Sequence, residues 1–151
     1  MQVTVISDTS CLIILEKIGQ VHLLKKLYSQ VFITKTVAEE FGRELPDFIK
    51  IKLPSEKNIK EVSSANIDFG EISAIALALD FENSLLIVDD MKARNVAISF
   101  GIKTSGSLGV LIEAKKSGHI RIVKTFIEQI SKTDFRLSED LIKAALKLAD
   151  E

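Results

Sequence analysis

Acidic side chains stand at the ends of two apolar runs in this sequence. Asp8 follows the apolar residues of "VISD", and Asp89 and Asp90 close the segment "LLIVDD". Such runs are typical of buried strands, and a carboxylate beside a core is costly unless another group pairs with it. Because carboxylate oxygens are the ligands that hard divalent cations prefer, these aspartates are candidates for a metal site.

Each of these aspartates also has a structural interpretation, because each precedes a segment with helical character. Aspartate is a favoured N-cap, since its side chain accepts a hydrogen bond from the first turn of the helix. Capping accounts for Asp8 taken by itself. One helix needs only one cap, however, so the pair Asp89 and Asp90 has a surplus member.

Glu40 is the next candidate, and the reason is its position relative to Glu39. The segment "TVAE", Thr36 to Glu39, matches the capping box S/T-x-x-E and gives Glu39 a structural role. Glu40 lies three residues after Val37, which predicts that it shares the buried side of the helix. A carboxylate there needs a partner, so we assign Glu40 rather than Glu39 to function.

Glu71 has both a structural and a functional interpretation. The segment "DFGE", Asp68 to Glu71, resembles a capping box with aspartate as the cap, and the helix dipole favours a carboxylate in the first turn. Glu71 also lies four residues before Ile75, at the border of the predicted inward face. Taken alone, Glu71 fits the structural role better.

The acidic residues carry more weight as a set, because clustered carboxylates repel one another. A hard divalent cation relieves that repulsion, which predicts Mg²⁺ or Mn²⁺. Zinc is not expected, since Cys11, His22 and His119 show no ligand spacing. A cation held by carboxylates suits phosphodiester hydrolysis, in which metal ions activate water and steady the leaving oxygen. The set consists of Asp8, Glu40, Glu71, Asp89 and Asp90.

The elements that must position these residues alternate along the chain. Apolar, β-branched runs predict strands over residues 3–7, 30–34, 48–53, 84–89 and 102–105. Helical spacing predicts helices over residues 10–18, 21–27, 35–43, 70–82, 91–100, 107–117, 121–132 and 139–150. Residues 54–69 are polar and fit neither pattern. The alternation is typical of an α/β domain with a parallel sheet, whose ligands bind at the carboxyl ends of the strands.

Composition narrows the remaining possibilities. The 151 residues suit a single domain, 1–151, and 46% hydrophobic residues suffice for a sizeable core. A net charge of −1 provides no global attraction to nucleic acid, so any polyanion site must be local. The single Cys11 excludes an internal disulfide framework and favours a cytoplasmic location. Charges interrupt the first apolar stretch, so neither a signal peptide nor a membrane span is expected.

In its ordered motifs the sequence resembles the PIN-domain family. The motifs are "DTS" after the first strand, "TVAEE", "GEISAIALA", "LLIVDD" and "SGSLGVL". The chain resembles in particular a subfamily related to the VapC-type toxins of toxin–antitoxin pairs. This resemblance implies a three-layer α/β/α fold with strand order 3-2-1-4-5 and a ribonuclease that depends on Mg²⁺ or Mn²⁺. It also implies RNA as substrate and a small antitoxin protein as partner.

The resemblance carries roles onto residues by motif position. Thr9 and Ser10 match small hydroxyl residues that help to orient the first aspartate and the substrate. Cys11 stands where a proline is usual, and Glu71 where aspartate is commoner, which extends that carboxylate by one carbon. Glu40 is implied as a metal ligand or as a base that orients water. The implied catalytic residues are Asp8, Glu40, Glu71, Asp89 and Asp90, with Asp8, Glu71, Asp89 and Asp90 as metal ligands.

Basic residues offer two places for substrate phosphates. Arg94 lies one turn after Asp90 and could bind a phosphate, but an i,i+4 ion pair with Asp90 explains it equally well. The second place is a local basic patch, for which a solvated helix face is the alternative. That patch comprises Lys115, Lys116, Arg121 and Lys124.

Two other classes of function remain as alternatives at the level of sequence. A PIN-fold binding module without catalysis would show no affinity for Mn²⁺. A phosphoacceptor receiver-like domain would place its acidic pair after the first strand and would accept phosphate from a small donor. For association, the helices over 121–132 and 139–150 carry apolar stripes wider than one packing face needs. This predicts a homodimer with a symmetric interface, the alternative being that both helices complete the monomer core.

Overall fold

The computed structural model describes residues 2–151. Its strands form one parallel sheet in the order β3-β2-β1-β4-β5, which confirms the expected 3-2-1-4-5 order. The register places Thr4 of β1 level with Ser84 of β4, so these two central strands run side by side. The strands are β1 (Thr4–Ser7), β2 (Val31–Ile33), β3 (Ile49–Ile51), β4 (Ser84–Ile87) and β5 (Lys103–Ser105).

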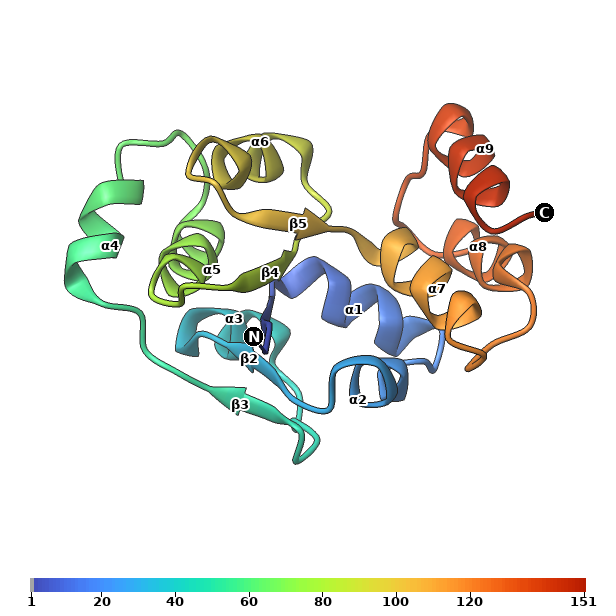
Figure 1. Cartoon of the computed structure of the whole chain (residues 1–151), viewed down its shortest axis with the longest axis horizontal. Coiled ribbons are helices and arrows are strands. Elements are labelled where there is room, and N and C mark those ends of the chain that lie inside the picture. The colour runs from blue at the N-terminus through green and yellow to red at the C-terminus, as the bar shows by residue number, and fades with distance from the viewer. Residues whose placement is uncertain (1) are drawn as a thin grey trace.

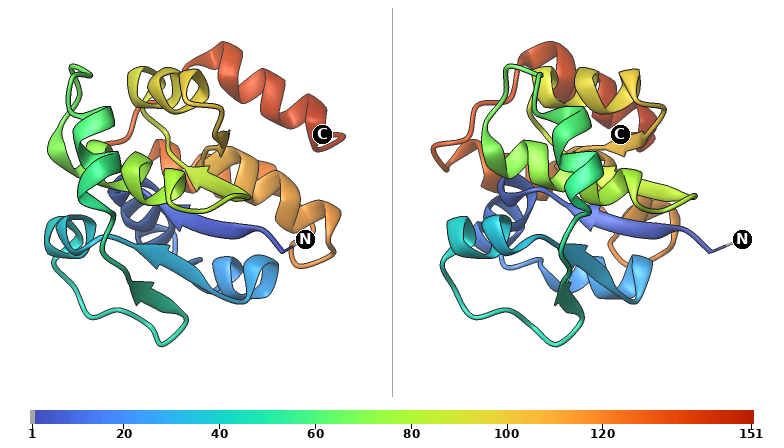
Figure 2. Two further views of the ribbon diagram at one scale, coloured as in Figure 1. Left: turned by 60° about the vertical axis from the view of Figure 1, so that its left-hand side comes forward. Right: turned by 90° about the vertical axis from the view of Figure 1, so that its left-hand side faces the viewer.

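Helices cover both faces of the sheet and make the three layers of an α/β/α fold (Figures 1 and 2). One layer contains α4 (Glu56–Val62), α5 (Phe69–Leu79) and α6 (Met91–Ser99). The other face is covered by α1 (Thr9–Lys17), α2 (His22–Tyr28), α3 (Lys35–Phe41), α7 (Ser107–Lys116), α8 (Val123–Ser131) and α9 (Glu139–Leu148). Across residues 2–151, no helix combines the length and apolar composition that a membrane crossing requires.

The strands supply side chains to two separate cores, because successive residues of a strand point to opposite faces. In β1, Val5 packs in the core beneath α1 and α7, whereas Ile6 packs in the core beneath α5 and α6. In β4, Ile87 and Leu86 divide between the cores in the same way. Burial on both faces explains why the strand sequences show little polar alternation.

One segment without a predicted element and the predicted helix that follows it differ from the structure in an informative way. The unassigned segment 54–69 contains α4, which Ser55 caps through its hydroxyl. This helix lies against α5, which contacts β1 and β4 as well as α3. As a result every residue from Ile72 to Ala78 is buried, not only one helical face.

The N-terminus of α3 corrects the predicted capping box. Thr34 is the N-cap, and its side-chain oxygen accepts a hydrogen bond of 3.1 Å from the N–H of Val37. Thr36 and Glu39 therefore lie inside the helix, and Glu39 has no capping role. The helix ends at Phe41 because Gly42 adopts a φ of 66°, which glycine tolerates better than other residues.

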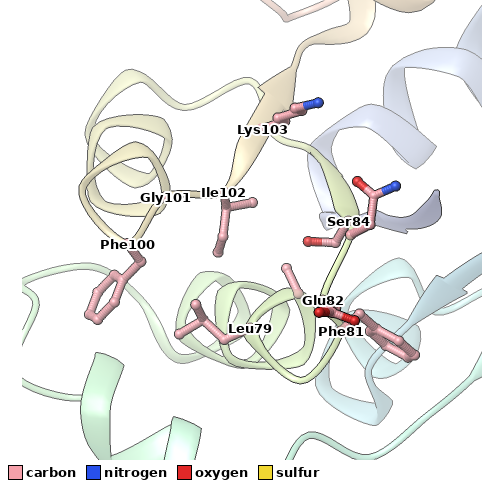
Figure 3. A pocket seen from close by; sticks show the side chains of 10 residues that line it. Leu79, Phe81, Glu82, Ser84, Phe100, Gly101, Ile102 and Lys103 are labelled. Carbon is pink, nitrogen blue, oxygen red and sulfur yellow. The ribbon is translucent and has the colours of Figure 1, made fainter. Parts of the chain in front are cut away.

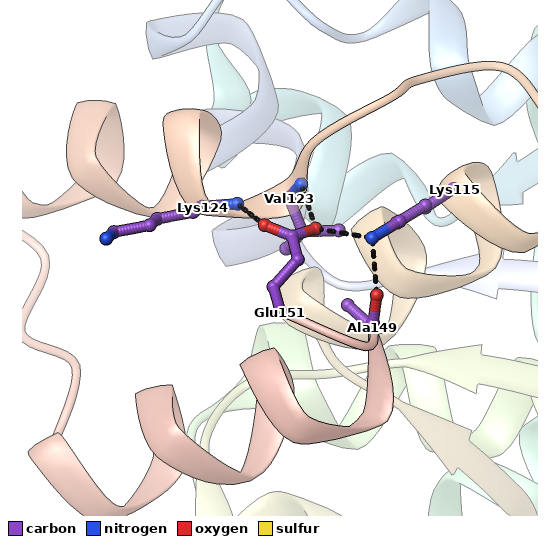
Figure 4. Close-up of polar contacts among 5 residues, drawn as sticks. All are labelled: Lys115, Val123, Lys124, Ala149 and Glu151. Carbon is purple, nitrogen blue, oxygen red and sulfur yellow. Dashed lines mark hydrogen bonds and ion pairs between the residues drawn. The ribbon is translucent and has the colours of Figure 1, made fainter.

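The C-terminal helix is fastened to the rest of the molecule by Glu151 (Figure 4). Its carboxylate accepts hydrogen bonds from the backbone N–H groups of Val123 (2.7 Å) and Lys124 (3.0 Å) at the start of α8. Lys115 donates to the same carboxylate at 2.9 Å and to the carbonyl oxygen of Ala149. These contacts keep α9 packed on α7 and α8.

Candidate active site at the carboxyl edge of the sheet

The chain leaves the central strand β1 toward β2 on one side, while β4 lies on the other side. This reversal creates a crevice at the carboxyl ends of β1 and β4, where open α/β sheets bind their ligands. The N–H of Asp8 donates to the carbonyl oxygen of Ile87 at 2.9 Å, which joins the two strand ends. Asp89 and Asp90 follow the end of β4 after Val88, so the fold brings the three aspartates to one edge.

Asp8 is buried at this crevice, with only 4% of its surface exposed. Its Oδ1 accepts a 2.8 Å hydrogen bond from the N–H of Thr9, so Asp8 also caps α1. Burial raises the pKa of Asp8 to about 7, against the lowering effect of the Thr9 hydrogen bond. The charges of Asp68, Glu40 and Asp89 raise it further. Three other carboxylates therefore lie near Asp8.

Glu71 occupies the first turn of α5 and takes part in the capping box that the sequence indicates. Its N–H donates to Asp68 at 2.8 Å, and its side chain accepts from the N–H of Asp68 at 3.3 Å. Burial raises the pKa of Glu71 to about 7, followed by the charges of Asp68, Asp8 and Asp90. Glu71 is thus a structural residue whose carboxylate also belongs to the acidic cluster.

Glu40 does not lie on the buried side of its helix, contrary to the expectation from the sequence. It is exposed on the rim of the site, whereas its neighbours Val37 and Phe41 are buried. Helix α3 spans only seven residues, of which Val37 and Phe41 are the buried ones. The Glu40 carboxylate instead turns toward the acids, and its Oε1 accepts a 2.7 Å hydrogen bond from the hydroxyl of Thr9.

A buried hydroxyl pair holds α3 against α5 beneath Glu40. Thr34 and Ser73 are hydrogen-bonded at 2.7 Å, and the Ser73 hydroxyl also contacts the carbonyl oxygen of Gly70 at 2.8 Å. At position 70 a Cβ atom would lie 2.9 Å from Cδ of Glu40. Glycine at this position therefore lets the Glu40 carboxylate pack directly on the backbone of α5.

The two aspartates after β4 are held in different ways. Asp89 is half-buried, and its carboxylate accepts from both the N–H (2.8 Å) and the hydroxyl (2.6 Å) of Ser107. Asp90 is exposed and caps α6 by accepting from the N–H of Ala93 at 2.9 Å. The surplus member of the pair is thus Asp89, because Asp90 provides the cap.

Arg94 does not form the ion pair with Asp90 that is one interpretation of the sequence; none of the ion pairs found in residues 2–151 includes it. One of its terminal nitrogens instead donates to the carbonyl oxygen of Val88 at 2.9 Å. Its Nε is buried without a hydrogen-bond partner among the described residues. The guanidinium packs against Gly106, beside Asp89. Arg94 is therefore a fixed positive charge at the edge of the acidic cluster.

The other residues predicted to meet substrate lie less close to the acids. Ser10 is half-buried in the first turn of α1, and within the described chain no hydrogen bond joins its hydroxyl to an acid. Lys115 is engaged by Glu151 in the last turn of α7, while Ser107 begins that helix. At 1.5 Å per residue the two ends are roughly 12 Å apart, which separates the predicted basic patch from the acids.

The acids fit a hydrated divalent cation rather than a closed metal cage. No group of three or more histidine, cysteine, aspartate or glutamate side chains within residues 2–151 is placed to hold a metal ion. Mg²⁺ does not require such a group, because it keeps several waters and commonly uses one or two carboxylates together with substrate phosphates. Burial is the main cause of the raised pKa values of Asp8 and Glu71, and neighbouring carboxylates, whose charge a cation would compensate, raise both further.

A separate cavity of about 180 Å³ lies at the opposite edge of the sheet (Figure 3). Ser84 and Lys103, which begin β4 and β5, line it together with Phe100 and Glu82. Figure 3 shows Leu79 and Phe100 on its apolar side. None of the five predicted acids contributes to this cavity, so it is distinct from the candidate site.

Sequence reasoning missed two residues that contact or neighbour the acids. Asp68 was expected only to cap α5, yet its charge raises the pKa of both Asp8 and Glu71. Ser107 was given no role, although it lies in the quoted segment "SGSLGVL". That motif follows the last strand, which is the one signal that could have placed Ser107 at the same edge of the sheet.

The three-layer fold with acids at the switch point defines a PIN-like class of protein. The comparison with protein families agrees, because the family described as PIN domain matches residues 4–151. The chain therefore belongs to the PIN-domain family, whose members are generally nucleases and usually use divalent metals. No curated protein matches the chain.

Proposed function

We propose that this protein is a ribonuclease that depends on Mg²⁺ or Mn²⁺ and is related to the VapC-type toxins. The observation that carries the proposal is the burial of Asp8 at the switch point of the sheet, with Glu40, Asp68 and Asp89 near enough to raise its pKa. Repulsion between these carboxylates does not stabilise the fold, so their clustering indicates a site for binding a cation.

The roles that we propose for the acids follow from their positions. We propose Asp8, Glu71, Asp89 and Asp90 as the residues that hold the metal. When bound, the metal would supply an activated water and charge stabilisation for the leaving oxygen. Glu40 lies on the exposed rim and is oriented by Thr9, which suits a residue that binds the metal or accepts a proton from water.

Arg94 is the residue that we propose to bind a substrate phosphate. It is not neutralised by an ion pair in the described chain, and its contact with the Val88 carbonyl fixes its position beside Asp89. The positive charge of Arg94 is needed at this place, because the cluster of acids by itself repels the phosphates of RNA.

The partners that we propose are RNA, a small antitoxin protein and a second copy of the chain, and the proposed location is the cytoplasm. The exposure of apolar residues on α8 and α9 is relevant to the proposed second copy. Val123, Ile127 and Ile130 of α8 are buried in the monomer, but Leu141 and Leu148 of α9 remain 45% and 61% exposed. Only the α9 stripe therefore supports a homodimer.

An RNA cleavage assay tests the proposal. The purified protein should cleave single-stranded RNA with Mg²⁺ or Mn²⁺, and EDTA should abolish the cleavage. Asp8→Asn should remove it as well, at unchanged folding. Asp134→Asn is the matched control, because Asp134 is an exposed acid that pairs with Lys17 far from the site. Cleavage that persists in EDTA, or in Asp8→Asn, would contradict the proposal.

The second candidate is a PIN-fold binding module that has lost catalysis. It is favoured by one observation, the lack of any described group of three side chains placed to hold a metal ion. Titration with Mn²⁺ separates the two, since a binding module without the metal site should show no affinity. Because the chain belongs to the PIN-domain family, we do not propose the receiver-like alternative.

A further inference from the structure

Ser107, the first residue of α7, donates two hydrogen bonds to the carboxylate of Asp89. The N–H of Ser107 donates to Oδ1 at 2.8 Å, and its hydroxyl donates to Oδ2 at 2.6 Å. Ser107 is only 2% exposed, so both of its donor groups are shielded from water. A carboxylate that accepts one donor on each oxygen has no freedom to rotate without losing both bonds.

The surroundings of Ser107 prevent it from moving with Asp89. Its side chain also lies next to the fully buried Cys11, which belongs to α1. On the other side the backbone is close to the acid, because a Cβ atom at position 106 would lie 2.9 Å from Oδ1 of Asp89. The orientation of Asp89 is therefore set by α1 and α7 before any ligand binds.

The two hydrogen bonds from Ser107 leave Asp89 able to bind a cation. Each carboxylate oxygen has two lone pairs, and Ser107 uses one on each oxygen. The ten-residue helix α7 also directs its N-terminus toward Asp89, and the positive end of the helix dipole attracts the carboxylate. Asp90 is not held in this way, since it is exposed and, within residues 2–151, its side chain accepts only from its own helix.

We propose that Ser107 is a positioning residue, which presents Asp89 as the pre-oriented metal ligand of the aspartate pair. The inference rests on the proposed function, because it assigns a role within the same site. Ser107 acts through Asp89 and touches neither the metal nor the RNA.

Binding of Mn²⁺ alone, measured by calorimetry without RNA, tests the role. Loss of a residue that orients a metal ligand typically weakens metal affinity by 10- to 100-fold, so Ser107→Ala should weaken Mn²⁺ binding at least tenfold. Ser107→Thr keeps the hydroxyl and should retain most of the affinity. Ser105→Ala is the matched control, because the Ser105 hydroxyl lies against Gly109 and donates a long hydrogen bond of 3.4 Å to the carbonyl of Gly106, and within the described chain it is not hydrogen-bonded to an acid. It should bind Mn²⁺ like the wild type.

Thermal unfolding without metal tests the contact itself. If Ser107 stabilises the fold through Asp89, the melting temperature of the double variant Ser107→Ala/Asp89→Ala should fall by less than the sum of the two single losses. Additive losses would overturn the inference. So would a Ser107→Ala variant that melts early but binds Mn²⁺ normally, since its role would then be structural. If the wild type binds no Mn²⁺, the proposed function fails, and the unfolding cycle still decides whether Ser107 holds Asp89.

Discussion

The hydroxyl of Thr9 donates a 2.7 Å hydrogen bond to Oε1 of Glu40, across 31 residues of sequence. The N–H of the same threonine donates to Asp8 at 2.8 Å. Thr9 therefore sets the relative positions of the buried acid and the acid on the rim, which belong to different elements of the fold.

The first prediction separates Glu40 from its neighbour. Glu40→Gln should reduce RNA cleavage by about 10²-fold or more, because a positioned base contributes on this order. Glu39→Gln should leave both cleavage and melting temperature unchanged, since Thr34 rather than Thr36 caps α3. Equal loss of cleavage in both variants would mean that only the net charge of α3 matters.

The second prediction concerns the close approach of Glu40 to α5. Gly70→Ala should push the Glu40 carboxylate away from Thr9, because the added methyl group would overlap with it. Cleavage should then fall as in Glu40→Gln, while circular dichroism shows a folded protein. In a Glu40→Ala background the space is free, so Gly70→Ala should have no further effect. A further loss there would show that the methyl group disturbs something other than Glu40.

The third prediction is a pH dependence of stability without metal. The folded-state pKa of Asp8, about 7, lies above the unfolded value of 3.8. The folded state therefore holds its proton more tightly, and this contribution is present below about pH 4 and lost as the pH rises to about 7. It amounts to at most about 4 kcal/mol. Glu71 acts in the same direction. Thermal unfolding in EDTA should show lower stability at pH 8 than at pH 5.

The control for this pH dependence is Asp8→Asn, which cannot ionise. It should flatten the pH profile and raise the melting temperature at pH 8, because the buried charge is gone. A wild-type profile that is flat, or that rises between pH 5 and pH 8, would contradict the raised pKa.

The fourth prediction is stabilisation by metal. A cation that binds only the folded state should raise the free energy of unfolding by about 2.7 kcal/mol at a concentration of 100 times its Kd. The gain should be larger at pH 8 than at pH 5, because protons compete with the metal for Asp8 and Glu71. Asp8→Asn should reduce it. An unchanged melting temperature across millimolar Mn²⁺ would count against the metal site.

The fifth prediction concerns association through α9. Static light scattering at micromolar concentration should give about twice the monomer mass of 16.7 kDa. Replacing the exposed Leu141 and Leu148 by lysine should return the protein to the monomer mass without unfolding it. A mass near 16.7 kDa for the wild type at all concentrations would exclude the homodimer.

Most of the fold could be read from local patterns. Apolar strand runs and helical spacing depend on neighbouring residues, so they located the strands and most helices within a few positions. The polar segment 54–69 was the exception, since α4 is held by packing on α5 rather than by a strong pattern of its own. The predicted capping box at Thr36 was wrong, because Thr34 offers an equivalent hydroxyl two residues earlier and local spacing does not distinguish the two.

The sequence by itself determined that Asp8, Asp89 and Asp90 stand at strand ends, because the apolar runs before them have no other stable place than a buried sheet. Only the tertiary structure decided which hydroxyl meets which acid. Ser107 holds Asp89 and Thr9 holds Glu40 through contacts between segments far apart in the chain. Such contacts arise from the order of the strands and the packing of α1, α3 and α7 at one edge, which no local periodicity encodes.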